Sequence, residues 1–561
     1  MMYLPKTHRK GRGSPFNGAA TMTMLRPKKK FNVKLGTITK HLGQYRPSTS
    51  GSADTSITGI SMNSKTVQDG DLYAAVAGAH HHGADYLDQA LHAGAVAVLT
   101  DASGMERVPQ NTPAIIVEDV RGALADAAAI IYNTTAATTP QMYGVTGTNG
   151  KTTTTYFLNA LLAAIGETTG LIGTIETRIA GQSVSSQFTT PEAPDLHSLV
   201  ALMRESSVTA AAMEVSSHAM AYKRTFGLQF EVVGFTNLTQ DHLDLHGTMD
   251  EYFASKRLLF SGDHSQKQVV TVNGGPDPAW GKTLSQQLPK AVTLDLGPAA
   301  VIEAEAPDAT WKITGIETSG IGHRFTLRHH SGYEVTTRVG MPGKFNVANA
   351  ALAAVMVYTG HAHKEWETIT AILASPEHSP FEAAVPGRME VISKQPTVIV
   401  DFAHNPDGLT QALEAVNRSK EHSGRTIIVF GATGQRDTAK RPLMGSIAAE
   451  YADVVIVTDD DPHHEEPSQI RKCVLEGAKA HIAAQKSDTQ VLDIAPRAQA
   501  LAYAVEIAGR HDTILAAGRG HETHQDIAGE PFAIDDREVL RRHLIDHGFI
   551  TTGTASAELT D

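Results

Sequence analysis

Short apolar runs alternate with amphipathic stretches through the last third of this chain. The runs are Thr397–Val400, Thr426–Phe430, Val454–Val457 and Thr513–Ala517, and a charged or glycine-rich loop directly follows each one. This alternation predicts parallel βαβ units and therefore an α/β domain. Since ligands in open α/β sheets bind beyond the carboxyl ends of the strands, the four loops predict a substrate site. Ordinary solvated loops are the alternative interpretation.

A second pattern, of strand, glycine-rich turn and helix, lies near residue 145. Gln141–Val145 is a short apolar run, Gly147–Thr153 has the sequence G-T-N-G-K-T-T, and Thr154–Ile165 has apolar residues at helical spacing. Backbone N–H groups and the positive end of a helix bind phosphate, a lysine adds a point charge, and a Thr hydroxyl can reach a metal. The segment therefore predicts a nucleotide site, with Val145 standing where a Walker A loop has glycine. A glycine turn that binds nothing is the alternative.

The same patterns divide the chain into a short basic segment and three α/β domains. We expect a disordered basic extension at 1–34, a small domain at 35–138, a large domain at 139–384 and a third domain at 385–561. The first acidic residue is Asp54, and no apolar core of signal-peptide type precedes it, so the sequence does not predict secretion. Translation from a later start such as Met24 would remove most of the extension. A basic arm that touches a membrane or nucleic acid is a lesser alternative.

Composition narrows the class of protein. At 561 residues the chain is too long for one hydrophobic core, and 41% hydrophobic with 19% charged residues is typical of a globular enzyme. A formal charge of −12 argues against general nucleic-acid binding. Cys473 is the only cysteine, which excludes an internal disulfide and fits a reducing compartment. No apolar run reaches the ~18 residues of a membrane span. We therefore expect neither a nucleic acid nor a membrane as a partner.

Several polar residues lie where strands and helices of the large domain are expected to end. Glu214 follows an apolar run, where together with Thr152 it could hold Mg²⁺ on the phosphates of ATP. A solvated carboxylate is the plainer interpretation. His242 offers a nitrogen ligand, and zinc is less favoured because no cysteine lies near it. Lys256 lies on an expected helix, where composition alone predicts a surface charge.

Nine motifs, in order along the chain, resemble those of the Mur ligase family, which forms amide bonds in peptidoglycan synthesis at the expense of ATP. The resemblance covers about residue 35 to 545 and is strongest to the MurE branch, which adds the third residue to UDP-N-acetylmuramoyl-L-Ala-D-Glu. The motifs are G-T-N-G-K-T-T (147–153), T-T-P-E (189–192), E-V-S-S-H-A (214–219), D-H-L-D-L-H-G (241–247), Y-F-A-S-K (252–256), G-K-F-N-V-A-N (343–349), P-G-R-M-E (386–390), D-F-A-H-N-P (401–406) and G-R-G-H-E (518–522).

The resemblance implies a cytoplasmic ligase of three α/β domains. These are a small N-terminal UDP-binding domain, a central P-loop-type ATPase domain with a mainly parallel sheet, and a C-terminal Rossmann-like domain that binds the amino acid. ATP would phosphorylate the D-Glu side-chain carboxylate, and the amine of the incoming amino acid would displace phosphate from the acyl phosphate. Because two anions meet in the first step, Lys151, Mg²⁺ and backbone donors must offset their repulsion. We expect a monomer whose third domain closes on the second.

The resemblance also implies roles for individual residues. The catalytic residues are Lys151, Lys256, Glu214 and His242. Mg²⁺ is bound by Thr152, Glu214, His242 and Lys256, once CO₂ has carbamylated Lys256 to N6-carboxylysine. Asn63-Ser64-Lys65 replaces the family's Asp-Ser-Arg. The implied ATP contacts are Gly147, Thr148, Asn149, Gly150, Lys151, Thr152, Thr153, Asn349, Arg388 and Asp401, and those to the UDP-linked dipeptide are Met62, Ser64, Ala79, His80, His81, Thr189, Thr190, Ser216 and Arg224.

One segment of the third domain bears on which amino acid is added. Relatives that add meso-diaminopimelate carry D-N-P-R, whose arginine grips the distal carboxylate in a forked pairing. Here the segment is D-D-P-H, followed by two glutamates, so an acidic pocket is expected to favour a distal ammonium. We predict L-lysine, then L-ornithine, then meso-diaminopimelate, with Arg436 on the α-carboxylate. The implied pocket residues are Arg436, Asp460, Asp461, Pro462, His463, Gly518 and Glu522.

Three other classes are weighed against this interpretation. A P-loop kinase for a small molecule would turn over ATP without an amine and would leave the loops of the third domain unexplained. Folylpolyglutamate synthetase shares the nucleotide loop, but the separate N-terminal domain and the D-H-L-D-L-H-G run fit it poorly. A non-catalytic nucleotide-binding regulator would require the loss of key positions, yet Lys151, Glu214, His242 and Lys256 are all present.

Overall fold

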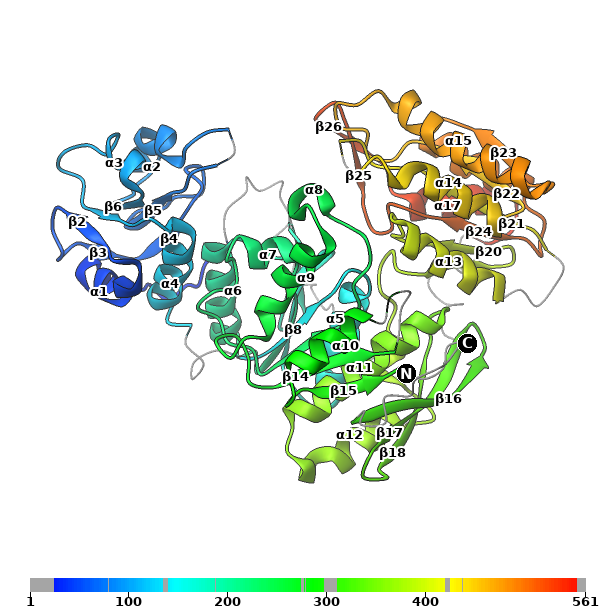
Figure 1. Ribbon diagram of the computed structural model, residues 1–561, viewed down its shortest axis with the longest axis horizontal. Coiled ribbons are helices and arrows are strands. Elements are labelled where there is room, and N and C mark those ends of the chain that lie inside the picture. The colour runs from blue at the N-terminus through cyan, green and yellow to red at the C-terminus, as the bar shows by residue number, and fades with distance from the viewer. Residues whose placement is uncertain are drawn as a thin grey trace, which may run out of the picture. The chain divides into compact units, whose positions relative to one another are not determined.

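The chain forms two compact units that divide between Tyr132 and Asn133 (Figure 1). The structure is a computed structural model, and it describes residues 25–78, 80–134, 140–186, 188–273, 277, 279–296, 310–418, 424–435 and 437–551. Residues 1–24 of the expected extension lie outside the described residues, as do residues 135–139 around the expected boundary between the first two domains. Among the described helices, none combines the length and apolar character that a membrane crossing requires.

The first unit is a small α/β domain built on a five-stranded sheet. The strand order is β2-β7-β6-β5-β4, parallel except for the edge strand β2. Arg26, within the span expected to be a disordered extension, donates to both carboxylate oxygens of the buried Asp71 at 2.6 Å. The elements are β1 (Val33–Lys34), α1 (Leu35–His41), β2 (Ser48–Ser50), β3 (Ser56–Ile57), β4 (Gly59–Ser61), β5 (Asp71–Ala75), α2 (Leu87–His92), β6 (Ala97–Thr100), α3 (Ala102–Met105), β7 (Ala114–Ile116) and α4 (Val120–Tyr132).

The second unit begins with a large sheet in the order β11-β10-β9-β12-β8-β13-β14-β15-β16-β17-β18. The strands from β9 to β16 run parallel, and antiparallel hairpins extend both edges. The strands are β8 (Gln141–Thr146), β9 (Thr169–Ile172), β10 (Glu176–Ile179), β11 (Gln182–Ser185), β12 (Ala210–Glu214), β13 (Val232–Phe235), β14 (Gln268–Val272), β15 (Val292–Asp295), β16 (Trp311–Ser319), β17 (Gly322–His329) and β18 (Glu334–Val339).

Helices pack on this sheet through one continuous apolar core. The first helix, α5, follows the glycine turn and packs against α11, and Phe157 and Leu161 of α5 share a buried cluster with Ala350 and Ala354 of α11. Most positions of α11 are buried, including all of residues 349–358, as expected of a helix whose central part is apolar all round. The helices are α5 (Lys151–Ala164), α6 (Ala193–Glu205), α7 (Ser217–Ala221), α8 (Leu243–His246), α9 (Met249–Arg257), α10 (Ala279–Gln287), α11 (Lys344–Gly360) and α12 (Trp366–Leu373).

A six-stranded sheet forms the last part of the second unit, coloured yellow to red in Figure 1. Its order is β19-β20-β24-β21-β22-β23, parallel except for the edge strand β19. Ile399 of β20 belongs to one apolar cluster and its neighbours Val398 and Val400 to another, so apolar cores lie on both faces. The strands are β19 (Glu390–Lys394), β20 (Thr397–Val400), β21 (Thr426–Phe430), β22 (Val454–Val457), β23 (Gln490–Asp493), β24 (Thr513–Ala516), β25 (His524–Ile527) and β26 (Glu530–Ala533).

Helices α13 (Pro406–Arg418), α14 (Lys440–Tyr451), α15 (Pro467–Gln485), α16 (Arg497–Ile507) and α17 (Asp536–Asp546) complete this part. The four apolar runs that begin at residues 397, 426, 454 and 513 are β20, β21, β22 and β24, neighbours in one parallel sheet. The predicted α/β class with mainly parallel sheets is therefore confirmed. Because the four strands run parallel, the loops that follow them leave the same edge of the sheet.

Candidate functional site

The glycine-rich turn between β8 and α5 has the conformation that a phosphate loop needs. Gly147 has φ 146° and Gly150 has φ 89°, in the region that favours glycine. A Cβ at Gly147 would collide with the Thr236 hydroxyl, and one at Gly150 would collide with the side chain of Asn349. Both glycines are thus required by close packing as well as by conformation. Helix α5 begins at Lys151, so its N-terminus faces the turn.

Two lysines converge on the same backbone carbonyl of this turn. Lys151 Nζ donates to Gly147 O at 3.1 Å and to Thr148 O at 2.8 Å, and Lys256 Nζ donates to Gly147 O at 2.7 Å. Lys256, on α9, is only 1% exposed. Burial, and then the neighbouring charge of Lys151, holds the pKa of Lys256 well below its usual value. The surface position that composition alone predicts for Lys256 is therefore wrong.

Glu214 lies beside the first turn of α5 because β12 and β8 are parallel neighbours. Thr152 Oγ1 donates to Glu214 Oε2 at 2.9 Å, and the Thr174 N–H donates to Glu214 Oε1 at 2.7 Å. The Glu214 side chain is buried rather than solvated. A hydroxyl and a carboxylate side by side are oxygen donors of the type that Mg²⁺ prefers. The predicted metal ligands Thr152 and Glu214 are therefore brought together, and their chemistry fits the ion.

His242, the residue before α8, is the other predicted metal ligand of this domain, and it lies close enough to Lys151 and Lys256 to be affected by their charge. Burial lowers the pKa of His242, the charge of Asp241 opposes this shift, and His218, Lys151 and Lys256 add to it, so that the pKa is about 4. The imidazole is therefore neutral at pH 7 and has a lone pair that can bind a metal. Its ring centroid lies 4.9 Å from that of His218 and 6.2 Å from that of Tyr252.

Residues of the C-terminal sheet reach the phosphate loop. Arg388 Nη2 donates to Thr152 Oγ1 at 3.3 Å, and its guanidinium lies 4.2 Å from the centre of the Phe402 ring. The loop after β20 is ordered by Asp401, which accepts from the N–H groups of Met389 at 2.7 Å and Ala403 at 2.8 Å. The predicted ATP contact Arg388 thus lies next to Thr152, and the predicted contact Asp401 is hydrogen-bonded to Met389, the residue after Arg388.

Asp407 is a residue of this region that the sequence interpretation missed. It lies in the first turn of α13, and its carboxylate accepts from Asn149 Nδ2 of the phosphate loop at 2.7 Å. Burial raises the pKa of Asp407, while the bond from Asn149 opposes the shift. Its position one residue beyond the D-F-A-H-N-P motif was the available signal.

The predicted dipeptide contacts of the central sheet also form one cluster. Thr190 Oγ1 donates to Glu214 O at 2.9 Å and accepts from the Ser216 N–H at 3.1 Å. Arg224 donates to Thr190 O at 3.0 Å and forms an ion pair with Glu192 at 2.6 Å. Thr189 accepts from the Thr174 hydroxyl at 3.1 Å. These side chains therefore adjoin the end of β12 that carries Glu214.

The predicted uridine contacts lie in the first unit. Ser64 is buried and its hydroxyl donates to Gln89 Oε1 at 2.9 Å. Met62 is half-buried, and His80 and His81 are exposed in the loop after β5. Ala79 lies outside the described residues. The roles of these residues stay predictions.

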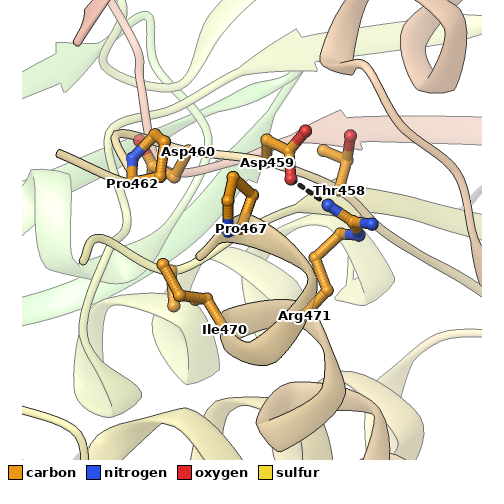
Figure 2. A pocket seen from close by; sticks show the side chains of 8 residues that line it. Thr458, Asp459, Asp460, Pro462, Pro467, Ile470 and Arg471 are labelled. Carbon is orange, nitrogen blue, oxygen red and sulfur yellow. Dashed lines mark hydrogen bonds and ion pairs between the residues drawn. The ribbon is translucent and has the colours of Figure 1, made fainter. Parts of the chain in front are cut away.

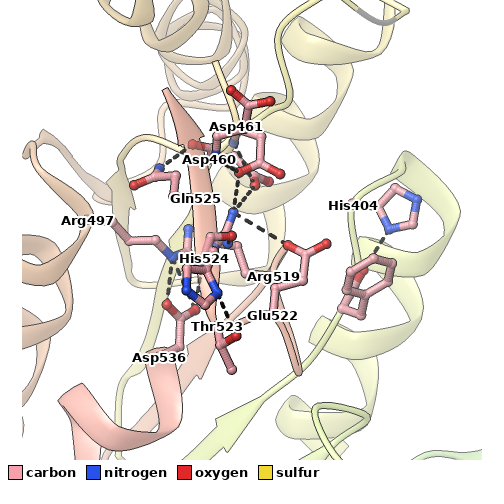
Figure 3. Close-up of polar contacts among 12 residues, drawn as sticks. His404, Asp460, Asp461, Arg497, Arg519, Glu522, Thr523, His524, Gln525 and Asp536 are labelled. Carbon is pink, nitrogen blue, oxygen red and sulfur yellow. Dashed lines mark hydrogen bonds and ion pairs between the residues drawn. The ribbon is translucent and has the colours of Figure 1, made fainter. Parts of the chain in front are cut away.

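An acidic cluster lies where β22 and β24 end. Asp460 and Asp461 follow β22 and Glu522 follows β24, and the three carboxylates surround the guanidinium of Arg519, which is fully buried (Figure 3). Gly518 has φ 106°, and a Cβ there would lie 2.9 Å from Asp460 Oδ2. The sequence prediction named these acids and Gly518 but not Arg519, although Arg519 belongs to the G-R-G-H-E motif. Arg436, predicted to hold the α-carboxylate, lies outside the described residues.

Glu522 is the perturbed acid of this cluster. Burial, followed by the charge of Asp460, raises its pKa to about 8, although Arg519 acts in the opposite direction. A carboxyl group that is largely protonated at pH 7 can be ionised by an arriving cation. The cluster therefore suits a positively charged ligand group.

His463, which occupies the position of the relatives' arginine, is bound to the β25–β26 hairpin. Its Nδ1 lies 3.0 Å from Asp526 Oδ2, its N–H donates to Asp526 O at 3.2 Å, and its carbonyl accepts from the Ala528 N–H at 2.6 Å. Pro462, beside it, lines a small hollow between the end of β22 and the start of α15, together with Thr458, Asp459, Asp460, Pro467, Ile470 and Arg471 (Figure 2). The ring of His463 thus pairs with the hairpin, whereas the acids of the D-D-P-H segment pair with Arg519.

Three models of the Mur ligase family match the chain. The Mur ligase middle domain matches residues 145–357, the Mur ligase, glutamate ligase domain matches residues 387–520, and the Mur ligase family, catalytic domain matches residues 56–132. A solved structure of a UDP-N-acetylmuramoyl-L-alanyl-D-glutamate–2,6-diaminopimelate ligase has a TM-score of 0.62 and 26% identity, and covers 93% of this chain and 100% of that one.

Two curated relatives match over nearly their full length. A UDP-N-acetylmuramoyl-L-alanyl-D-glutamate–2,6-diaminopimelate ligase of Streptomyces coelicolor is 39% identical over 523 residues, or 92% of this chain and 98% of that protein. A UDP-N-acetylmuramyl-tripeptide synthetase of Leifsonia xyli subsp. xyli is 40% identical over 500 residues, which are 88% of this chain and 93% of that protein. Where these names specify the amino acid, it is 2,6-diaminopimelate. They support the diaminopimelate alternative better than the predicted L-lysine.

Proposed function

The chain belongs to the ATP-dependent Mur ligase family, and from this premise we propose that it is a MurE-type synthetase of the cytoplasm. It joins a diamino acid to the D-Glu of UDP-N-acetylmuramoyl-L-Ala-D-Glu and releases ADP and phosphate. The observation that carries the proposal is the convergence of Lys151, Lys256 and the Thr152–Glu214 pair on one phosphate loop. The acidic cluster around Arg519 supports a second site for an amine.

The phosphate loop acts on ATP by electrostatics and positioning. The N–H groups at the start of α5 and the Lys151 ammonium face the phosphates, and Arg388 adds a guanidinium beside Thr152. Thr152, Glu214 and His242 would hold Mg²⁺, which neutralises phosphate charge and orients the γ-phosphate. The dipeptide contacts Thr190 and Arg224 adjoin Glu214, so the D-Glu carboxylate would meet the γ-phosphate there.

The reaction proceeds in two displacements. A carboxylate oxygen of D-Glu bonds to the γ-phosphorus as the bond to the β–γ bridging oxygen breaks, and ADP leaves. The neutral α-amine of the amino acid then bonds to the acyl carbon, the bond from that carbon to the phosphate oxygen breaks, and the phosphate departs with that oxygen and with the proton that the nitrogen loses. In the first step the cations of the loop reduce the electrostatic repulsion between the carboxylate and the γ-phosphate. The second step requires that the amine is held next to the acyl phosphate and that water is excluded.

Lys256 suits carbamylation because its amine is buried and its pKa is low. A neutral amine attacks the carbon of CO₂, a C–N bond forms, a proton passes to solvent, and a carboxylate replaces the cation. The depressed pKa supplies that neutral amine. The resulting carboxylate would lie beside Gly147 and Lys151, where an anion gains from the Lys151 charge. It would also supply another oxygen ligand for Mg²⁺.

The identity of the amino acid has two candidates. The names of the relatives support 2,6-diaminopimelate. A specific observation supports L-lysine, with L-ornithine beside it, because Asp460, Asp461 and Glu522 gather at the Arg519 guanidinium and the raised pKa of Glu522 indicates that a further positive charge there would be stabilised. A pocket with excess negative charge favours a distal ammonium over a distal carboxylate. His463 is no substitute for a forked arginine, since its ring is bonded to Asp526.

An ADP-release assay tests the function and the choice together. Purified protein receives ATP, Mg²⁺ and the muramoyl dipeptide with meso-diaminopimelate, L-lysine or L-ornithine in parallel. We expect ADP release that requires both the dipeptide and one diamino acid, with product detected by mass. ADP release that ignores the amino acid would point to a kinase or hydrolase instead, and no release with any of the three would overturn the proposal.

A further inference from the structure

Arg519 connects three separate segments of the C-terminal sheet. Its Nη1 donates to Asp460 Oδ1 at 3.3 Å and to Asp461 Oδ1 at 2.6 Å, and lies 3.4 Å from Glu522 Oε2. Its Nη2 donates to the carbonyl of His524, the first residue of β25. The guanidinium therefore joins the loop after β22, the loop after β24 and the hairpin (Figure 3).

The three acids need a cation to remain together. One oxygen from each of Asp460, Asp461 and Glu522 lies within 4.8 Å of the others, and Asp460 is 4% exposed. Like charges at this separation repel strongly where water is largely excluded. Arg519 is fully buried beside these carboxylates. Its five donors in a fixed fork can serve several acceptors at once, which a lysine ammonium cannot reproduce.

Backbone bonds make the array rigid. Asp461 accepts a hydrogen bond from the Asp526 N–H at 2.9 Å in addition to the bond from Arg519, and the Gly434 N–H donates to the carbonyl of Asp461 at 2.8 Å. Gln525 donates to the carbonyl of Asp460. With all three acids ionised, the cluster keeps an excess of negative charge after Arg519 is counted.

We propose that Arg519 is a positioning residue for the amino-acid substrate, which holds Asp460, Asp461 and Glu522 as one fixed set of acceptors for an ammonium group. The inference rests on the proposed function and specifies how its second site is built. Arg519 does not touch the reacting atoms. It sets the spacing and the charge of the acids that bind the amine, so it acts on amino-acid binding and leaves ATP binding unchanged.

Arg497 provides the matched comparison. It is also fully buried and makes a forked pair with Asp536, at 2.6 Å for its closest contact, and it donates to the Ala517 carbonyl at 2.9 Å. Its carboxylate partner belongs to α17 rather than to the acidic cluster (Figure 3). Replacing either arginine disturbs a buried pair, but only Arg519 holds the three acids.

The experiment compares Arg519→Lys, Arg519→Gln and Arg497→Lys with the wild type. Michaelis constants are measured for ATP and for whichever of meso-diaminopimelate, L-lysine and L-ornithine the wild type uses. We expect KM for the amino acid to rise about tenfold in Arg519→Lys and about 100-fold in Arg519→Gln, because a displaced substrate group costs up to that factor. KM for ATP should stay within about twofold. Arg497→Lys, which keeps the positive charge and removes no bond to the three acids, should change the amino-acid KM less than Arg519→Lys does, despite a lower Tm.

A pH profile separates positioning from a general loss of structure. Glu522 faces Asp460, Asp461, Arg519, Arg388 and Arg497. Because Arg519 favours its ionised form, Arg519→Gln should move the pH dependence of amino-acid KM to higher pH, and Arg519→Lys should restore most of the wild-type profile. If Arg519→Gln does not fold, the Lys variant and its profile decide.

Calorimetric titration with L-lysine and meso-diaminopimelate distinguishes the two proposals. Binding by the wild type without ADP release would overturn the proposed function alone. Equal changes in KM for ATP and the amino acid in the Arg519 variants, or the same change in Arg497→Lys, would overturn the role of Arg519. Absence of binding of either amino acid to the wild type would overturn both.

Discussion

Two buried cations of the second unit have opposite electrostatic surroundings. Lys256 donates to the carbonyl of Gly147 and shares this acceptor with Lys151, a second cation. Arg519 is surrounded by Asp460, Asp461 and Glu522. At the phosphate loop the lysine is the perturbed group, and the pKa of Lys256 falls. At the acidic cluster a carboxyl group is the perturbed group, and the pKa of Glu522 rises to about 8.

The two pKa shifts indicate which sign of added charge would stabilise each site. At the phosphate loop Lys151 and Lys256 share one carbonyl acceptor, and each disfavours the charge of the other, so an anion beside them, such as the phosphates of ATP or a carbamate on Lys256, would be stabilising. The acidic cluster has an excess of negative charge and is stabilised by a cation, such as an ammonium. An enzyme that activates an acid with ATP and then captures an amine needs one site of each kind. The predictions below test this contrast.

Removing the Lys256 side chain should have the largest effect. Lys256→Ala is expected to lower kcat by about 1,000-fold, because one charged group is lost from a buried site that stabilises the transferring phosphate. If Lys256 carries the proposed carbamate, small carboxylic acids such as acetate should restore part of the activity by supplying a carboxylate in its place. ADP release measured with and without acetate checks this result.

The surface lysine Lys472, 64% exposed on α15, is the control for Lys256. Lys472→Ala should keep full activity and show no response to acetate. Wild-type activity in Lys256→Ala would mean that the amine at the phosphate loop has no part in the reaction.

Glu214→Gln should have the second largest effect, a decrease of about 100-fold in kcat. The amide keeps the shape of the side chain but removes the negative charge beside Thr152, so the Mg²⁺ concentration for half-maximal activity should rise. A titration with MgCl₂ measures it, with the exposed Glu476→Gln as control. An unchanged Mg²⁺ requirement would remove Glu214 from the metal site.

At the acidic cluster the expected effect is a dependence on pH. Glu522 has a raised pKa, so at pH 6.5 it is protonated and an ammonium must displace its proton, whereas near pH 8 it is half ionised. KM for the amino acid should therefore fall about tenfold between pH 6.5 and 8. Glu522→Gln should flatten this profile and raise KM. A wild-type KM that increases over the same interval contradicts the assignment.

Substitution of His463 should have the smallest effect. Its ring is bonded to Asp526, so His463→Ala is expected to change KM for the amino acid less than about threefold, the loss of one exposed pair. Kinetics with L-lysine and meso-diaminopimelate check this value. A large change in preference between the two would show that the histidine itself contacts the substrate.

The sequence predicted the parts of this molecule that depend on local pattern. The strands β20, β21 and β22 have the bounds of the apolar runs, because strands buried on both faces are continuously apolar. The G-T-N-G-K-T-T pattern predicted a phosphate loop, and Gly147 and Gly150 have the backbone conformations that such a turn requires. Residues whose role depends on tertiary contacts were not found from pattern, notably Arg519 and Asp407. No periodicity in a sequence shows that an arginine will be buried among carboxylates from two strand ends.

Local pattern alone could not predict the surroundings of Lys256 and His463, although the family resemblance implied a catalytic role for Lys256. A lysine on a helix is usually exposed, and only the packing of α9 against the phosphate loop buries this one. The D-D-P-H segment suggested that His463 faces the substrate, whereas the hairpin β25–β26, distant in sequence, binds its side chain. In both cases a contact between remote segments decides the chemistry.

The most direct test of the account follows an oxygen atom through the reaction. UDP-N-acetylmuramoyl-L-Ala-D-Glu labelled with ¹⁸O in the D-Glu side-chain carboxylate is incubated with ATP, Mg²⁺ and the preferred diamino acid, and the released phosphate is examined by mass spectrometry. If the phosphate loop activates the carboxylate and the amine then displaces phosphate, each phosphate carries one ¹⁸O. Phosphate without ¹⁸O would show that ATP cleavage and amide formation do not share an acyl phosphate, and would contradict the account.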